Sequence, residues 1–105
     1  MKILYLTIKK KWFDLIKSGK KKIEYREIKH YWEKRLFEGN GKKLKHFDYI
    51  IFTNGYKKDS PKLKVEYKGL SLKDFDGKLH YALHLGKVEE INDYALSQNG
   101  VKNET

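Results

Sequence analysis

Residues 19–26 read Gly-Lys-Lys-Lys-Ile-Glu-Tyr-Arg, and this stretch joins two kinds of secondary structure. Before it, the apolar residues between positions 12 and 16 recur at helical spacing, and a glycine is typical of the end of a helix. From Lys22 to Ile28 apolar and charged residues alternate, which predicts a strand. Glu24 and Arg26, two residues apart, therefore point to the same face of that strand.

The rest of the chain predicts short strands separated by turns. The nearly continuous apolar run Ile3–Ile8 favours a strand covered on both faces, and Gly69 predicts a bulge in its strand. Five strands and two short helices in about ninety residues predict an α+β, mainly β fold. We expect a mixed, partly closed β-barrel of about five to six strands with two short helices at its ends. The expected strands are Ile3–Ile8, Lys22–Ile28, Phe47–Thr53, Lys62–Leu72 and Tyr81–Ile91. The first expected helix begins at Lys10, and the second covers His30–Leu36.

Length and composition limit the number of domains and the cellular compartments that we expect for this protein. A chain of 105 residues accommodates one domain, which we expect at 1–91, followed by a polar C-terminal tail at 92–105. There is no cysteine and no apolar run near the length that crosses a bilayer, so we expect a cytoplasmic protein without membrane association. The four histidines lack metal-ligand spacing, so we expect neither a metal nor a cofactor.

The formal net charge of +10 predicts attraction to polyanions. Either RNA or an acidic protein partner would satisfy such a field. However, all but two of the 24 cations are lysine, and a lysine-rich chain also results from an AT-rich genome. A solvated lysine surface without a specific partner explains the composition equally well.

The two arginines are therefore more informative than the lysines. Arg26 belongs to the pattern Gly-x-Lys-x-x-Glu-x-Arg, which begins at Gly19 and includes Lys21 and Glu24. An arginine in a lysine-rich chain indicates that a planar, bidentate donor is required. The alternative is that Glu24 and Arg26 simply pair on a solvated face.

This pattern resembles the signature of ASCH domains, small members of the PUA-like superfamily, in which it also follows a strand and a short helix. The resemblance to stand-alone ASCH proteins of bacteria and phages covers approximately residues 1–91. It implies a PUA-like β-barrel with a cleft for RNA or a modified nucleoside or nucleotide. The residues that support the resemblance outside the pattern are Glu24–Trp32, Lys34–Leu36, Asn54–Tyr56 and Pro61–Glu66.

By position, the resemblance implies that Lys21, Glu24 and Arg26 line the cleft. Arg26 or Lys21 would bind a phosphate, and Glu24 would accept a hydrogen bond from a base edge. Trp32 would stack on an unpaired base, although a tryptophan on a short helix is more often a core residue. The next candidates are Arg35, Asn54 and Tyr56: Tyr56 is a second stacking candidate, and Asn54 serves equally well as a turn residue.

Two other functions remain open on the sequence. Some ASCH proteins hydrolyse the acyl group from nucleosides of the N(4)-acetylcytidine type, and some are described as ribonucleases. The members that hydrolyse this amide carry threonine at the position of Glu24. Here Glu24 would instead activate water, and Lys21 or Arg26 would stabilise the oxyanion, in a metal-independent hydrolase. The last alternative is a phage factor that binds an acidic host protein.

Overall fold

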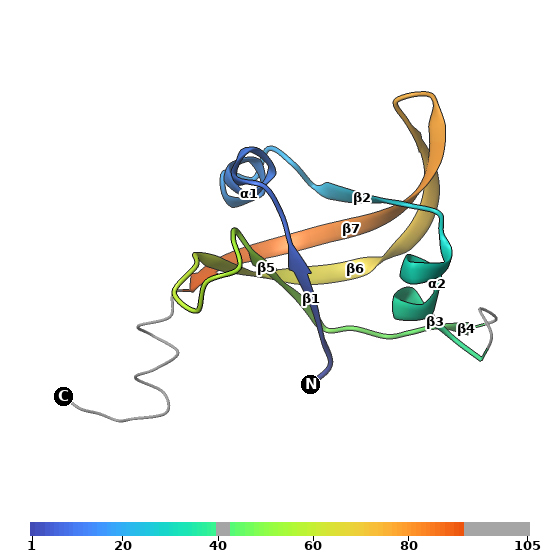
Figure 1. Ribbon diagram of the computed structural model, residues 1–105, viewed down its shortest axis with the longest axis horizontal. Helices are drawn as coiled ribbons and strands as arrows, with labels where there is room; N and C mark the ends of the chain where they lie inside the picture. The colour runs from blue at the N-terminus through green and yellow to red at the C-terminus, as the bar shows by residue number, and fades with distance from the viewer. Residues whose placement is uncertain (40–42, 92–105) are drawn as a thin grey trace.

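The computed structural model describes residues 1–39 and 43–91, so the tail expected at 92–105 lies outside the described residues. The mainly β, α+β class is confirmed, and both helices lie where the sequence predicts them (Figure 1). The elements in chain order are β1 (Ile3–Thr7), α1 (Lys10–Lys17), β2 (Ile23–Glu27), α2 (His30–Leu36), β3 (Phe37–Glu38), β4 (Lys43–Leu44), β5 (Tyr49–Thr53), β6 (Lys62–Phe75) and β7 (Lys78–Ile91).

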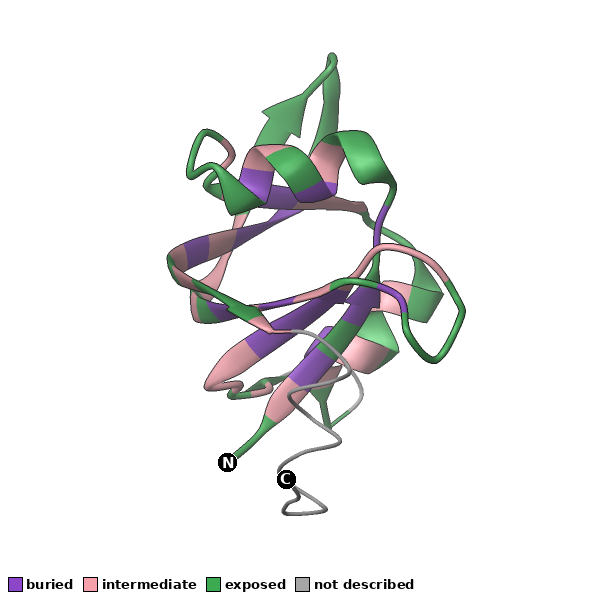
Figure 2. Ribbon diagram, turned by 90° about the vertical axis from the view of Figure 1, so that its left-hand side faces the viewer, coloured by how far each residue is buried: buried purple, intermediate pink, exposed green. Residues whose placement is uncertain are grey.

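Five of these strands form one sheet in the order β1-β5-β6-β7-β2, and β3 and β4 form a separate small pair. β1 and β5 run parallel, whereas the other neighbours are antiparallel. The sheet curls strongly (Figure 2), but β1 and β2 are its two edges and do not pair with each other. The sheet is therefore not closed into a barrel. Part of the free edge of β1 is occupied by α2 instead, because Arg35 Nη2 donates to the Tyr5 carbonyl oxygen at 2.9 Å.

The first strand is covered on one face only, which corrects the expectation for Ile3–Ile8. Leu4 and Leu6 are buried, whereas Tyr5 between them is 61% exposed. An edge strand whose outer face meets solvent alternates in burial even when its sequence is almost continuously apolar. The apolar run therefore predicts the strand correctly, but the prediction that both of its faces are covered is wrong.

β6 and β7 form a long hairpin that extends beyond the predicted strands. The turn is Asp76-Gly77, and both residues have positive φ, at 56° and 76°. Two such residues form the tight turn that matches the twist of a hairpin. The register shifts between Tyr67 and Gly69, where the sequence predicts a bulge. The tip of the hairpin projects beyond the rest of the sheet and brings Phe75 toward β2 (Figure 1).

The core fills the inside of the curved sheet. α1 contributes Phe13 and Ile16, and α2 contributes Leu36, so each helix covers the core from one end of β2. Within the described residues, no helix has the length and apolar character that crossing a membrane requires. The largest fully buried side chains are Phe52, Ile16, Leu36, Ile50, Leu63, Leu83 and Val65.

Candidate functional site

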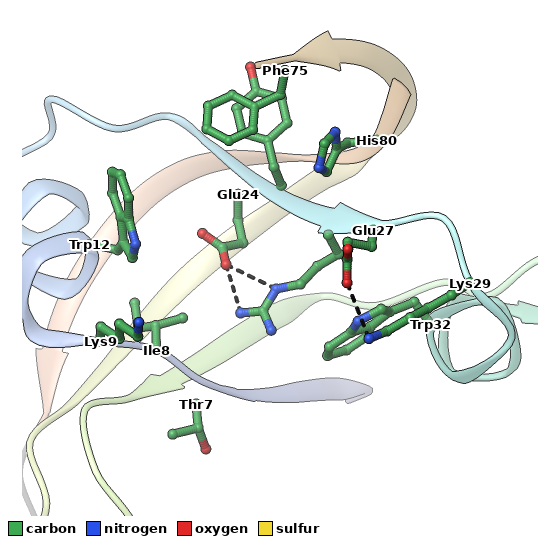
Figure 3. Close-up of a pocket in the computed structure, with 12 residues that line it drawn as sticks. Thr7, Ile8, Lys9, Trp12, Glu24, Glu27, Lys29, Trp32, Phe75 and His80 are labelled. Carbon is green, nitrogen blue, oxygen red and sulfur yellow. Dashed lines mark hydrogen bonds and ion pairs between the residues drawn. The ribbon is translucent and has the colours of Figure 1, made fainter. Parts of the chain in front are cut away.

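A cavity of about 450 Å³ lies where the sheet remains open between its two edges. We call it the seam cavity, because it separates the end of β1 from β2. Helices α1 and α2 and the tip of the β6–β7 hairpin complete its walls (Figure 3). Its lining residues are Thr7, Ile8, Lys9, Trp12, Glu24, Tyr25, Arg26, Glu27, Lys29, Trp32, Phe75 and His80.

Glu24 and Arg26 form an ion pair inside this cavity. Arg26 Nε and Nη2 both donate to Glu24 Oε2, at 3.0 and 2.6 Å. Lys21 Nζ lies 3.5 Å from the other carboxylate oxygen, Oε1. The side chains of Glu24, Arg26 and Lys21 are only 8%, 16% and 14% exposed. The two residues do pair, but they do so on an inward face and not on the solvated face that the simpler interpretation assumed.

The register of β2 explains why this polar pair points inward. Glu24 lies opposite Leu83 and Arg26 lies opposite Tyr81, and both of these β7 residues belong to the core. Directly opposite residues of an antiparallel pair share a face, so the ion pair continues the core face up to the open edge. Figure 3 shows Glu24 pointing from β2 toward β1.

The ion pair leaves polar groups available to a ligand. Oε2 of Glu24 accepts both bonds from Arg26, whereas Oε1 has only the longer contact with Lys21. Among the described residues, Arg26 Nη1 makes no hydrogen bond. One acceptor and one donor of the ion pair therefore remain available to a ligand.

Aromatic rings hold the cations of the site in place. The Arg26 guanidinium carbon lies 4.8 Å from the centre of the Trp32 ring. Lys21 Nζ lies 5.0 Å from the ring centre of Trp12 and 5.4 Å from that of Tyr25. Such cation–π contacts favour these positions of the charged groups. Trp32 both packs against the core and lines the cavity, so the two interpretations of this residue are compatible.

Lys21 belongs to a smaller neighbouring cavity of about 110 Å³. This cavity shares Trp12, Glu24, Tyr25 and Phe75 with the seam cavity, and Lys21 is its only further lining residue. The rings of Tyr25 and Phe75 are stacked, with centres 4.3 Å apart. Lys21 therefore lies behind the aromatic wall, beside the ion pair.

The cavity also carries charges farther along β2 and at the start of α1. Glu27 Oε1 lies 3.2 Å from Lys29 Nζ, and Glu27 Oε2 lies 3.9 Å from Lys78 Nζ. The hydrogen bond and charge of Lys29, followed by the charge of Lys78, lower the pKa of Glu27. Lys9 makes no ion pair within the described residues, so it is the cation most available to an anionic ligand.

Besides Lys21, three residues named by the sequence lie outside the lining of the seam cavity, namely Arg35, Asn54 and Tyr56. Tyr56 is 94% exposed. Asn54 Nδ2 donates to the Ile8 carbonyl oxygen at 3.1 Å, and Arg35 donates to the Tyr5 carbonyl oxygen. Asn54 and Arg35 thus hold β1 in place beside the cavity, and direct contact of these three residues with a ligand stays a prediction.

The sequence did not indicate the β1 and hairpin residues of the cavity. Thr7, Lys9, Phe75 and His80 carry no motif. The curvature of the sheet brings Thr7 and Lys9 to β2, whereas His80 lies directly opposite Glu27 in the pairing of β2 with β7. Trp12 looked like an ordinary core position of a short helix. No group of histidine and acidic residues in the described ranges has a geometry that holds a metal ion.

Comparison with known proteins adds no relative. A scan against models of protein families and searches of curated proteins and of solved structures find no match to this chain. The resemblance to ASCH domains therefore stays a prediction, and the function has to be inferred from the site itself.

Proposed function

We propose that the protein binds single-stranded RNA or a free nucleotide, modified or unmodified, by taking one unpaired base into the seam cavity. The observation that carries this proposal is the combination, in one cavity, of the Glu24–Arg26 pair with aromatic side chains. A base has π faces that stack on aromatic rings and an edge that offers donors and acceptors, so it matches both features.

The charges of the site favour a base inside the cavity and phosphates at its rim. A phosphate placed beside Glu24 would meet a buried carboxylate, which repels it. Lys9, at the start of α1, lies on the lining without a carboxylate partner in the described residues. We therefore assign the base to Glu24 and Arg26, and the backbone phosphates to Lys9 and neighbouring surface lysines.

Fluorescence anisotropy with labelled hexauridylate, hexacytidylate and hexaadenylate tests this proposal. At about 50 mM salt we expect saturable binding of at least one hexamer. Arg26→Ala should weaken it by about ten- to a hundredfold, because hydrogen bonds from a charged donor are lost. Lys58→Ala is the matched control, since it removes one positive charge away from the cavity. Absence of binding to all three hexamers, or equal affinities of the two variants, would contradict the proposal.

A metal-independent hydrolase is the second candidate, and one observation favours it. Oε1 of Glu24 is not used by Arg26, and the Lys21 ammonium lies 3.5 Å from it. A carboxylate that is free on one oxygen can take a proton from water, and a nearby cation can stabilise the oxyanion. Incubation with N(4)-acetylcytidine would then release cytidine and acetate. Glu24→Gln should abolish that release, whereas an equal rate in Glu24→Gln would indicate a contaminant.

A further inference from the structure

The open edge of β2 directs main-chain groups into the seam cavity. Leu85 N donates to the Lys22 carbonyl oxygen at 3.0 Å, and the strands pair antiparallel from Ile23 to Glu27. In such a pair, alternate residues bond to the partner strand and the residues between them point away. Glu24 and Arg26 therefore bond to β7, while the N–H and C=O of Tyr25 face the open side.

The edge of β1 has the same property. Ile8 N donates to the Thr53 carbonyl oxygen at 2.9 Å, and Asp48 N donates to the Lys2 carbonyl oxygen at 2.8 Å. The even-numbered residues of β1 thus bond to the β5 side, and Tyr5 and Thr7 point away from it. The bond from Arg35 to the Tyr5 carbonyl oxygen comes from that open side, as this alternation requires.

Thr7 and Tyr25 consequently bring unpaired main-chain groups to one cavity. Both residues line it, and no hydrogen bond within the described part of the chain reaches the outward N–H or C=O of either residue. A main-chain donor or acceptor without a protein partner has to be satisfied by water or by a ligand. Each wall of the cavity therefore offers one donor and one acceptor.

We propose that the main-chain groups of Thr7 and Tyr25 read the hydrogen-bonding edge of the base that enters the seam cavity. This inference rests on the proposed function, and it adds which groups of the protein determine the preference for one base over another. The ligand class is a flat heterocycle with an N–H donor next to an acceptor, as in a pyrimidine or purine. In a closed barrel, β1 and β2 would form main-chain hydrogen bonds with each other. The ring takes the place of these bonds at the level of one residue in each strand.

The size of the open edge favours a base over a peptide strand. The Tyr5 carbonyl oxygen is already used by Arg35, and Thr7 is the outward-facing residue of β1 that lines the seam cavity. Trp12 and Trp32 lie on opposite sides of Glu24 in Figure 3 and limit the cavity along β2. A peptide strand needs several consecutive residues of free edge to pair, whereas a base needs one or two groups.

A proline substitution tests the Tyr25 N–H directly. Tyr25→Pro and Tyr25→Ala both remove the ring and its stacking on Phe75, but only proline also removes the N–H. Since this N–H points away from β7, proline is compatible with the edge strand. For whichever of hexauridylate, hexacytidylate and hexaadenylate the wild type binds most tightly, we expect Tyr25→Pro to bind about three- to tenfold more weakly than Tyr25→Ala.

Amide hydrogen exchange of the wild-type protein gives a second test that needs no variant. Without RNA, the Tyr25 amide should exchange faster than the amides of Glu24 and Arg26, which bond to β7. With the saturating hexamer, its exchange should slow about tenfold or more. Equal affinities of the two variants with unchanged Tyr25 exchange would overturn this inference alone. A wild type that binds no hexamer would overturn the proposed function, and this inference with it. Protection of Thr7 and Tyr25 by a strand-forming peptide and not by the hexamers would overturn it in favour of a protein partner.

Discussion

At the scale of single residues, the buried Glu24 carboxylate balances two cations that have little access to water. Replacing it with leucine leaves Arg26 and Lys21 in place without a counter-charge. Removal of one partner of a buried ion pair is strongly destabilising, so we expect Glu24→Leu to lower the free energy of unfolding by about 3 kcal/mol. Urea denaturation followed by tryptophan fluorescence measures this loss.

The double variant Glu24→Leu/Arg26→Leu is the control for that prediction. An apolar pair of similar volume in a buried position often matches the stability of the ion pair it replaces. We therefore expect the double variant to recover most of the lost stability and to bind the RNA hexamers as weakly as Arg26→Ala does. A double variant less stable than Glu24→Leu would show that the pair is required for folding and would weaken its assignment to binding.

A second residue-scale prediction concerns Tyr81, which is buried in β7. Burial, and secondarily the charge of Glu33, raises the pKa of Tyr81 above its ordinary value of 10.0. The folded protein thus holds this proton more tightly than the unfolded chain, so the associated stability is complete below pH 10 and is lost as the pH rises through the folded pKa. We expect the free energy of unfolding to fall by up to about 1.4 kcal/mol per pH unit above 10 from this group.

Urea titrations of the wild type and of Tyr81→Phe between about pH 8 and pH 11 check this pH dependence. Tyr67, whose pKa is also raised by burial, should still cause a fall in the variant. The wild-type curve should therefore descend more steeply than that of Tyr81→Phe above pH 10. Parallel curves would assign the alkaline loss of stability to other groups.

The sequence predicts that Glu24 and Arg26 share one face of a strand, but the local pattern does not predict that this face is buried. Their spacing of two residues places them on one face of any strand. By the usual alternation, the face with Ile23 and Tyr25 should be the buried one. Glu24 is instead the most buried residue of β2, because its face meets the inside of the curved sheet at the open edge. That orientation depends on the register with β7, which the local pattern does not encode.

At the scale of elements, the end of α1 sets the course of the chain into the site. Gly19 has φ of +81° and follows Ser18, the residue that caps α1, and its N–H donates to the Ile16 carbonyl oxygen. A Cβ atom built at Gly19 meets no other atom within 4 Å, so a substitution is opposed by backbone strain alone. We expect Gly19→Ala to lower the free energy of unfolding by about 1 kcal/mol.

Gly19→Asn is the matched variant, because asparagine tolerates the left-handed conformation better than alanine does. It should be more stable than Gly19→Ala in thermal denaturation, although its side chain is larger. If alanine proved the better tolerated of the two, the conformation at the end of α1 would not be the determining factor.

The elements themselves are predictable to different degrees. α2 lies at His30–Leu36 as predicted, since local spacing and composition determine a short amphipathic helix. The strands are also found, but two of them are longer than predicted. β6 continues to Phe75 and β7 begins at Lys78, because a two-residue turn connects the two strands directly. The open edge between β1 and β2 could not be predicted. Part of this edge is occupied by Arg35 of α2, which donates to the Tyr5 carbonyl oxygen, a contact between residues 30 positions apart.

At the scale of the whole molecule, the net charge of +10 and the seam cavity make different contributions to binding. The field of the lysines is independent of base identity, because backbone phosphates carry the same charge in every sequence. The cavity has one carboxylate, one guanidinium and two strand edges, so its contribution depends on the base. Salt therefore should weaken binding of all hexamers similarly and should leave their order of affinity unchanged.

The salt dependence also identifies the lysines that contact phosphate. For single-stranded RNA, the logarithm of the association constant falls with the logarithm of salt concentration by about 0.7 per phosphate neutralised. Lys9 lines the cavity without an ion pair in the described ranges, so Lys9→Ala should reduce this slope by about one phosphate equivalent. Lys58→Ala, which removes an equal charge outside the cavity lining, should change it much less. Equal slopes for the two variants, measured by anisotropy from about 50 to 300 mM salt, would mean that the diffuse lysine field alone holds the RNA backbone.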